Sequence, residues 1–261
     1  MSLDEEFKRP IETSIGKVSG NEIFVHGHNL TGELMGELDL GSMLYLLVRG
    51  ERPSPKVARL FNTVLVALVD YGLSPMALSA RLTLTGAPDA IQGAVASGVL
   101  GVGSRFVGVW EDVGRMLADA RVNQTTQDSE LAAQAKGICA DHIAAGRTIP
   151  GLGHPFHKTT DPRSARIYAV ARETGPLGPH ARLMEHVREQ AASLHGKNLV
   201  LNPAGACGAV LLDLGFDARI LRGLVAVARA AGIVGHLQEE LERPMGPALW
   251  HLARTTATYV D

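Results

Sequence analysis

The chain has 261 residues, of which 46% are hydrophobic and 20% charged, so it can bury one large core or two smaller ones. Its formal net charge is −2 and it has no basic run, which argues against nucleic acid as a partner. Its two cysteines, Cys139 and Cys207, are too few for a disulfide framework. Its N-terminus is acidic, unlike that of a signal peptide, and charges or glycines interrupt its apolar runs before they reach membrane-spanning length. We therefore expect a cytoplasmic globular protein that has neither a signal peptide nor a membrane partner.

The N-terminal part contains the one good hairpin candidate. Residues 12–26 alternate weakly between apolar and polar and contain the turn sequence Ser-Gly-Asn. His26 and His28 follow in a segment expected to be extended, where both rings would share one face. A metal ion needs further ligands, and the sequence places no third one nearby, so we predict no metal site.

From Asp39 onward the pattern favours helix after helix. Serine or aspartate followed by proline marks several helix starts, glycine marks several ends, and apolar residues recur at intervals of three and four. The helix that begins near residue 88 is rich in glycine and alanine, which favours close packing at the centre of the protein or at a subunit interface. We predict helices at 39–50, 54–72, 74–85, from 88, 104–120, 129–145, 162–174, 179–195, 203–214 and 218–241. Short loops between many helices indicate an all-α protein.

Residues 149–163, IPGLGHPFHKTTDPR, carry an unusual density of functional groups. Gly151 and Gly153 flank a leucine, so the backbone can turn sharply and approach a ligand. Asp161 and the proline after it read as the start of the helix at 162–174.

Three kinds of nitrogen group accompany this turn. His154 follows the second glycine, Lys158 lies four residues later, and Arg163 lies in the first turn of the helix. Such a set at a helix N-terminus suits a ligand rich in carboxylate or phosphate. A tight interhelical loop that merely contains two histidines is the alternative, and we favour the ligand site because the groups are clustered.

The segment GLGHPFHKTTDPR resembles the G-x-G-H…DPR signature of the citrate synthase superfamily, which includes the citryl-CoA-cleaving module of ATP-citrate lyase. The resemblance extends to SRFVG earlier in the chain and to VARAAG and LERP later in it. It implies an all-α fold with a small N-terminal β-hairpin. It also implies a large helical domain made of residues 1–108 and 211–261, and a small CoA-side domain made of residues 109–210.

The resemblance also implies roles for individual residues. Arg163 and Arg229 would hold the carboxylates of a 2-oxo acid such as oxaloacetate, because a guanidinium pairs with a carboxylate through two hydrogen bonds. Arg243 would reach into the neighbouring subunit's site, which implies a homodimer with shared active sites. His154 would hydrogen-bond the oxo-acid carbonyl or the tertiary hydroxyl of the condensed substrate.

The CoA side of the site follows from the same resemblance. Gly151, Gly153 and Lys158 fall where the family binds the CoA thioester, which is a substrate, so no permanently bound cofactor is expected. Phe106 belongs to the predicted substrate-binding set, since ATP-citrate lyase also has Arg-Phe at this place, whereas true citrate synthases have an enol-stabilising histidine there.

Two other departures bear on the chemistry. Tyr71 occupies the place of a family histidine, and Ala204, in LNPAGACG, occupies the place of the catalytic aspartate. Losing an acid or base commonly costs about 10²–10⁴-fold in rate. We predict a citryl-CoA lyase-like enzyme that cleaves or forms a citryl-CoA-type thioester, with His154 and Tyr71 as catalytic residues and acetyl-CoA and oxaloacetate as products. Two alternatives stay open: a condensing acyltransferase for another 2-oxo acid or acyl-CoA, and a non-catalytic homologue that binds CoA ligands or a partner protein.

Overall fold

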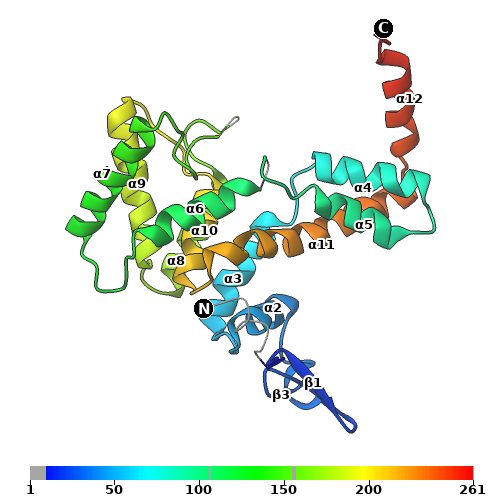
Figure 1. Ribbon diagram of the computed structural model, residues 1–261, viewed down its shortest axis with the longest axis horizontal. Coiled ribbons are helices and arrows are strands. Elements are labelled where there is room, and N and C mark those ends of the chain that lie inside the picture. The colour runs from blue at the N-terminus through cyan, green and yellow to red at the C-terminus, as the bar shows by residue number, and fades with distance from the viewer. Residues whose placement is uncertain (1–9, 106, 155–156, 261) are drawn as a thin grey trace. The chain divides into compact units, whose positions relative to one another are not determined.

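The computed structural model describes residues 10–105, 107–154 and 157–260 (Figure 1). Its contacts divide the chain into two units, residues 1–62 and 63–261. The predicted division at residues 108 and 210 concerns a different boundary and stays a prediction.

The first unit begins with a small antiparallel sheet, as the hairpin prediction for residues 12–26 requires. Gly16 pairs with Val25 at one end of the first hairpin, and Val25 also pairs with His28 of a third, two-residue strand. The strands, in sheet order, are β1 (Gly16–Ser19), β2 (Glu22–Val25) and β3 (His28–Asn29).

The His26/His28 pair does not have the extended geometry expected from its spacing. His26 lies in a turn with a positive φ of 47°, and its Nε2 lies 3.3 Å from the carbonyl oxygen of Leu47. His28 instead uses Nδ1 to contact Glu33 at 3.1 Å. The turn therefore gives each ring its own partner.

Two helices complete most of the first unit. After a single π-helical turn, η1 (Leu30–Leu34), α2 (Leu40–Arg49) begins where Asp39 accepts a hydrogen bond from the backbone N–H of Ser42. It ends at Gly50, whose φ of 77° suits glycine. Helix α3 (Pro55–Leu68) carries the chain into the second unit.

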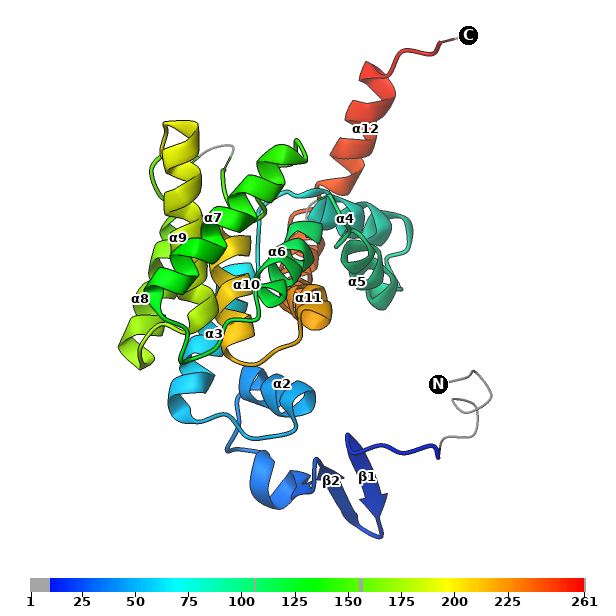
Figure 2. The same ribbon diagram turned by 60° about the vertical axis from the view of Figure 1, so that its left-hand side comes forward.

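Helices joined by loops make up the second unit in its described residues, apart from an isolated β-bridge between Leu152 and Leu201 (Figure 2). Nearly every residue of α10 is buried, and the helix packs against α6, α8 and α9, so it forms the centre of this part of the core. Both cysteines are buried and free, consistent with the expectation that they form no disulfide framework. The helices are α4 (Pro75–Gly86), α5 (Ile91–Leu100), α6 (Gly108–Asp119), α7 (Asp128–Ala144), α8 (Pro162–Thr174), α9 (Pro179–His195), α10 (Pro203–Asp213), η2 (Ala218–Ile220), α11 (Leu221–Glu242) and α12 (Gly246–Thr256).

The small residues of α5 allow the close packing that the sequence predicts. A Cβ atom on Gly98 would lie 2.8 Å from Ile233 of α11 and 3.0 Å from the carbonyl oxygen of Met76 of α4. Helices α4, α5 and α11 therefore meet at a spacing that a larger residue would prevent. The apolar cluster that they share is made of Ala80, Leu84, Ala94, Ile233 and Leu237.

One segment, Ala218–Glu242, is long and apolar enough by length and composition to cross a membrane, with a mean hydropathy of 1.5. This corrects the expectation that every apolar run stops short of that length. The segment consists of η2 and α11, and α11 packs against α4, α5 and α6. One third of the segment's 18-residue apolar window, 33%, is buried in this chain. Helix α11 also carries Arg229 into a cavity and pairs a buried glutamate with an arginine of α4, so we interpret it as part of the helical fold.

The predicted helices are present, with shifted ends. Helix α3 ends at Leu68 instead of residue 72 because a turn follows, in which the side chain of Asp70 accepts a hydrogen bond from the N–H of Gly72. Helix α12 was not among the predicted helices, although Pro247 lies in its first turn, a common start signal.

Candidate functional site

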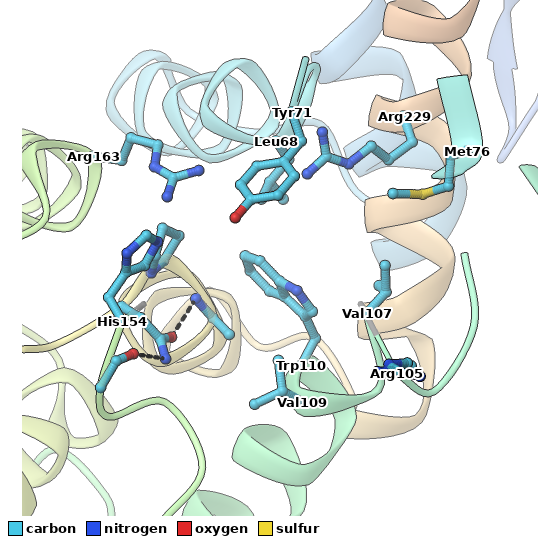
Figure 3. A pocket seen from close by; sticks show the side chains of 14 residues that line it. Leu68, Tyr71, Met76, Arg105, Val107, Val109, Trp110, His154, Arg163 and Arg229 are labelled. Carbon is cyan, nitrogen blue, oxygen red and sulfur yellow. Dashed lines mark hydrogen bonds between the residues drawn. The ribbon is translucent and has the colours of Figure 1, made fainter. Parts of the chain in front are cut away.

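A cavity of about 210 Å³ lies in the second unit, where α6, α10, α11, the start of α8 and the turn after α3 meet (Figure 3). Its lining mixes polar and apolar side chains. It includes four of the residues predicted from the sequence: Tyr71, His154, Arg163 and Arg229. The remaining lining residues are Leu68, Met76, Arg105, Val107, Val109, Trp110, Gly153, Asn202, Pro203 and Ala204.

The glycine turn and the start of α10 hold each other in place. Gly151 and Gly153 have φ values of 84° and 86°, a conformation that favours glycine. A Cβ atom on Gly205 would lie 2.6 Å from the carbonyl oxygen of Gly151, so the two backbones touch. The side chain of Asn202 donates to the carbonyl of Gly153 at 3.0 Å and accepts from the N–H groups of Ala204 and Gly205. This interlocking brings His154 and Ala204 into one cavity.

One hydrogen bond assigns the tautomer of His154. The backbone N–H of His157 donates to Nδ1 of His154 at 3.1 Å, so Nδ1 is unprotonated and the neutral ring carries its proton on Nε2. Burial, more than any other influence, lowers the pKa of His154 below its ordinary value, and the nearby Asp161 only partly opposes this. At neutral pH the ring is therefore an uncharged Nε2–H donor, which suits the polarisation of a ligand oxygen.

Asp161 fixes the guanidinium of Arg163. Its carboxylate is fully buried, caps α8 by accepting the N–H of Arg163 at 2.9 Å, and accepts Nε and Nη2 of the same side chain at 3.1 and 2.9 Å. Burial raises the pKa of Asp161, but the hydrogen bonds from Arg163 outweigh it and leave the pKa below its usual value. Asp161 was predicted only as a helix cap, and its second role is to orient Arg163.

Tyr71 lies between two guanidinium groups. The centre of its ring is 5.8 Å from Cζ of Arg163 and 5.7 Å from Cζ of Arg229. Figure 3 shows the phenol hydroxyl directed toward the open space between His154 and Trp110.

Arg229 differs from these groups in having a buried hydrogen-bond donor without a partner among the described residues. This donor is its Nε, and burial lowers the pKa of Arg229. A buried donor without a partner is costly, and such a donor beside a cavity indicates that an anionic ligand completes the site.

A chain of polar contacts supports the Tyr71 turn from behind, and no sequence pattern indicated it. Asp70 accepts Nε2–H of His236 at 2.9 Å, and Nδ1 of His236 accepts Nη2–H of Arg81 at 2.9 Å. Arg81 is fully buried and also donates to Glu240 at 2.9 Å, and the other oxygen of Glu240 accepts the N–H of Gly246 at the start of α12. These residues are separated by up to 176 positions, and their chemistry alone gives no signal that they meet.

We expect Arg81→Met to lower the free energy of unfolding by about 3–5 kcal/mol, since removing one partner of a buried ion pair leaves the other charge uncompensated. Urea denaturation would measure the change. Arg166→Met is the matched control: Arg166 is an exposed helical arginine whose pair with Glu173 should contribute at most about 1 kcal/mol. Equal changes in the free energy of unfolding for the two substitutions would contradict the view that Arg81 forms a buried, stabilising ion pair.

Other predicted residues lie outside this cavity lining. Arg243 is the C-cap of α11, its side chain is 77% exposed, and it pairs with Glu239 at 3.2 Å. Gly151 packs against Gly205 of α10 and does not line the cavity. Lys158 belongs to the same loop and does not line the cavity either. Phe106 lies outside the described residues. Its neighbour Arg105 does line the cavity, and the SRF segment that carries both was the available signal.

One group in the described ranges has the spacing of a metal site. Ligand atoms of His154, His157 and Asp161 lie within 4.8 Å of one another. However, Nε2 of His154 carries the proton in the tautomer assigned above, so it offers no lone pair to a metal ion. Both oxygens of Asp161 are already bound by Arg163. We interpret the group as a hydrogen-bonded network, and the absence of a metal remains a prediction.

Comparison with known proteins places these features in a family. The model of the citrate synthase C-terminal domain family matches residues 19–249. The probable ATP-citrate synthase of Dictyostelium discoideum is 25% identical over 246 residues, which cover 87% of this chain and 38% of that protein. ATP-citrate synthase beta chain protein 1 of Arabidopsis thaliana is 27% identical over 220 residues, which cover 77% of this chain and 34% of that protein. The chain thus spans less than two fifths of the length of these relatives.

Solved structures share the fold over nearly the whole chain. The structure of citryl-CoA lyase from Hydrogenobacter thermophilus superimposes with a TM-score of 0.85 and 30% identity, covering 97% of this chain and 95% of that one. ATP citrate lyase from Methanothrix soehngenii, in complex with citrate and coenzyme A, gives a TM-score of 0.78 at 23% identity, covering 100% of this chain and 44% of that one. The predicted resemblance and the all-α fold class with its small N-terminal sheet are therefore confirmed, and the chain belongs to the citrate synthase family.

Proposed function

We propose that the protein is a citryl-CoA lyase-like enzyme that cleaves a citryl-CoA-type thioester into acetyl-CoA and oxaloacetate. The observation that carries the proposal is the convergence of His154, Arg163 and Arg229 on one cavity. An uncharged N–H donor beside two guanidiniums matches a hydroxyl flanked by carboxylates. The similarity to a citryl-CoA lyase over 95% of that chain's length supports the same substrate class.

The proposed cleavage moves one proton and breaks one carbon–carbon bond. The tertiary hydroxyl loses its proton, its oxygen becomes the carbonyl of oxaloacetate, and the bonding electrons pass to the thioester as an enolate. His154 donates its Nε2 hydrogen bond to the oxygen that becomes the carbonyl. The enolate carbon then takes a proton to give acetyl-CoA.

Tyr71 is our proposed source of that proton. Ala204 has no acidic group, whereas the phenol of Tyr71 faces the same cavity between two guanidiniums. The phenol oxygen takes the proton of the tertiary hydroxyl in the same step in which the phenol gives its own proton to the enolate carbon, so no separate base holds a proton between the two transfers. The protonation state of the protein is therefore unchanged at the end of a turnover.

The assembly and the CoA side are part of the same proposal. We infer a cytoplasmic homodimer in which Arg243, exposed in the single chain, reaches the partner's site. The CoA thioester is a substrate that binds along Gly151, Gly153 and Lys158, near the cavity lined by Gly153, and Phe106 contacts the substrate. Light scattering of the purified protein tests the dimer, and an Arg243→Met dimer without activity would support the shared site.

Incubation of the purified protein with citryl-CoA tests the central proposal. Acetyl-CoA is measured by chromatography and oxaloacetate by its enzymatic reduction with NADH. Equal amounts of both products, formed faster than in buffer, are expected. A rate equal to that in buffer would contradict the proposal.

We expect Arg229→Met to lower kcat/KM for citryl-CoA by roughly 10- to 150-fold, since a hydrogen bond to a charged group is worth about 1.5–3 kcal/mol. The same substitution should leave the free energy of unfolding unchanged or higher, because it removes a buried, incompletely paired charge. Steady-state kinetics and urea denaturation measure the two effects. Arg219→Met, an exposed arginine paired with Asp217, is the control that should leave kcat/KM unchanged.

Ala204 favours a second candidate, a non-catalytic homologue that binds CoA ligands. The residue is buried and lines the cavity together with Pro203 and Trp110. Calorimetric binding of CoA by a protein that turns over no citryl-CoA would favour this candidate. Thiol release from an acyl-CoA with a panel of 2-oxo acids would instead identify a condensing enzyme.

A further inference from the structure

A second cavity, of about 150 Å³, lies at the start of α8. Its polar lining comes from the loop before α8, from the first turn of α8, from α9 and from the segment after α9. It shares no lining residue with the cavity around His154. The polar lining residues are Thr159, Thr160, Ser164, Arg188 and Asn198.

Ser164 is the feature that distinguishes this cavity. The residue is 3% exposed, and its hydroxyl oxygen is buried without a hydrogen-bond partner in the parts of the chain that the structure describes. Buried hydroxyl groups in proteins are normally paired, so an unpaired one beside a cavity points to a bound molecule that completes it.

The other groups around the cavity indicate that this molecule is an anion. Ser164 lies in the first turn of α8, where the helix dipole is positive. The proline that begins the helix has no N–H and Asp161 accepts that of Arg163, so Ser164 supplies the next backbone N–H of this turn. Arg188 adds a full positive charge from α9. Its acidic neighbour Glu189 is 3.7 Å away on the same helix, a loose and exposed pair that leaves the guanidinium available.

The loop that supplies the threonines is held in place. The side chain of Asn198 donates a hydrogen bond to the carbonyl of Thr159 at 2.9 Å, which fixes the loop against the segment after α9. The hydroxyls of Thr159 and Thr160 are therefore presented on an ordered backbone. Several donors, one guanidinium and a helix N-terminus around a small volume suit a tetrahedral oxyanion.

We propose that this cavity binds a phosphate-type oxyanion through Ser164, Arg188 and the threonine pair. The anion is either free inorganic phosphate or a phosphate group of a larger molecule such as CoA. The lining residues Thr160 and Ser164 flank Asp161, the residue that caps α8 and orients Arg163, so the site lies at the start of the helix that carries Arg163.

Calorimetric titration of the full-length protein with sodium phosphate, at constant ionic strength and without CoA, tests the site. Saturable binding is expected, with a Kd at least about tenfold higher in Arg188→Met, since a charged hydrogen bond is lost. Ser164→Ala should raise the Kd less. In phosphate-free buffer Ser164→Ala should not lower the melting temperature, because it removes only an unpaired buried hydroxyl, and an unchanged melting temperature shows that the variant is folded.

Two control variants distinguish this cavity from the surface of α8 and from the cavity around His154. Arg166→Met changes an exposed arginine of the same helix and should leave the Kd unchanged. Arg229→Met changes the catalytic cavity. Phosphate binding that persists in Arg188→Met but disappears in Arg229→Met would overturn the proposal. A titration of the wild-type protein that shows no saturable phosphate binding would also overturn it. Because these titrations measure binding and not turnover, their result does not depend on whether the protein cleaves citryl-CoA.

Titration with CoA and with dephospho-CoA identifies the source of the anion. A loss of affinity in Arg188→Met that appears with CoA and not with dephospho-CoA would assign the site to the 3′-phosphate. Equal affinities of Arg188→Met and wild type for both compounds, together with weakened phosphate binding, would assign it to free phosphate.

Discussion

Replacing His154 with alanine is expected to lower kcat for citryl-CoA cleavage by about 10²–10³-fold, the usual effect of losing a positioned hydrogen-bond donor to the reacting oxygen. His154 is the lining residue whose ring nitrogen is fixed by a backbone hydrogen bond from His157, so its Nε2–H has one direction. KM should change less, because Arg163 and Arg229 still hold the carboxylates. Rapid-quench measurement of acetyl-CoA would provide the single-turnover rate.

The pH dependence of the wild-type rate gives an independent check on the role of His154. Burial holds the pKa of His154 below its ordinary value of about 6.5. The wild-type rate should therefore stay constant as the pH falls through 6.5 and decline only near the lower pKa of the folded protein. The unfolded chain binds a proton at higher pH than the folded one, so this residue lowers stability as the pH falls below about 6.5.

The stability difference between wild type and His154→Ala should accordingly depend on pH in that window. Above about 6.5 both states hold a neutral ring, and the difference is constant. Below it, the wild type loses stability that the variant has no imidazole to lose. His195→Ala, which changes a histidine of the last turn of α9, is a control outside the cavity lining. A wild-type acid limb centred at or above 6.5 would contradict the neutral, buried donor.

Local chemistry explains which parts of this site could be predicted from the sequence. The glycine turn, His154 and the Asp-Pro-Arg helix start are consecutive, so their meeting depends on one loop. Arg229 and Tyr71 were predicted from family resemblance, and packing between α11 and the turn after α3 brings them together: a Cβ on Gly232 would lie 2.0 Å from the carbonyl oxygen of Val69.

Contacts between distant, chemically ordinary residues could not be predicted. Arg81 reads as a polar residue of an amphipathic helix, yet it is fully buried because Glu240 and His236 reach it from α11. Ser164 likewise reads as a routine first-turn serine, and its unpaired hydroxyl becomes evident only when α8, α9 and the segment after α9 are assembled. Sequence pattern records the periodicity of each helix, whereas these features depend on how three elements meet.

Tyr71→Phe should reduce kcat by about 10²–10⁴-fold with little change in KM, because it removes one proton donor and keeps the ring. The phenylalanine ring can occupy the same place between Arg163 and Arg229, so the cation–π contacts at 5.8 and 5.7 Å persist. Ala204→Asp, made in the Tyr71→Phe background, would place a carboxyl group on the same cavity and should recover part of the lost rate. Solvent deuterium incorporation into acetyl-CoA, followed by mass spectrometry, reports directly on the protonation of the enolate carbon. If Tyr71→Phe keeps kcat within a few-fold of wild type, Tyr71 does not supply that proton, and the enolate must take it from His154 or from water.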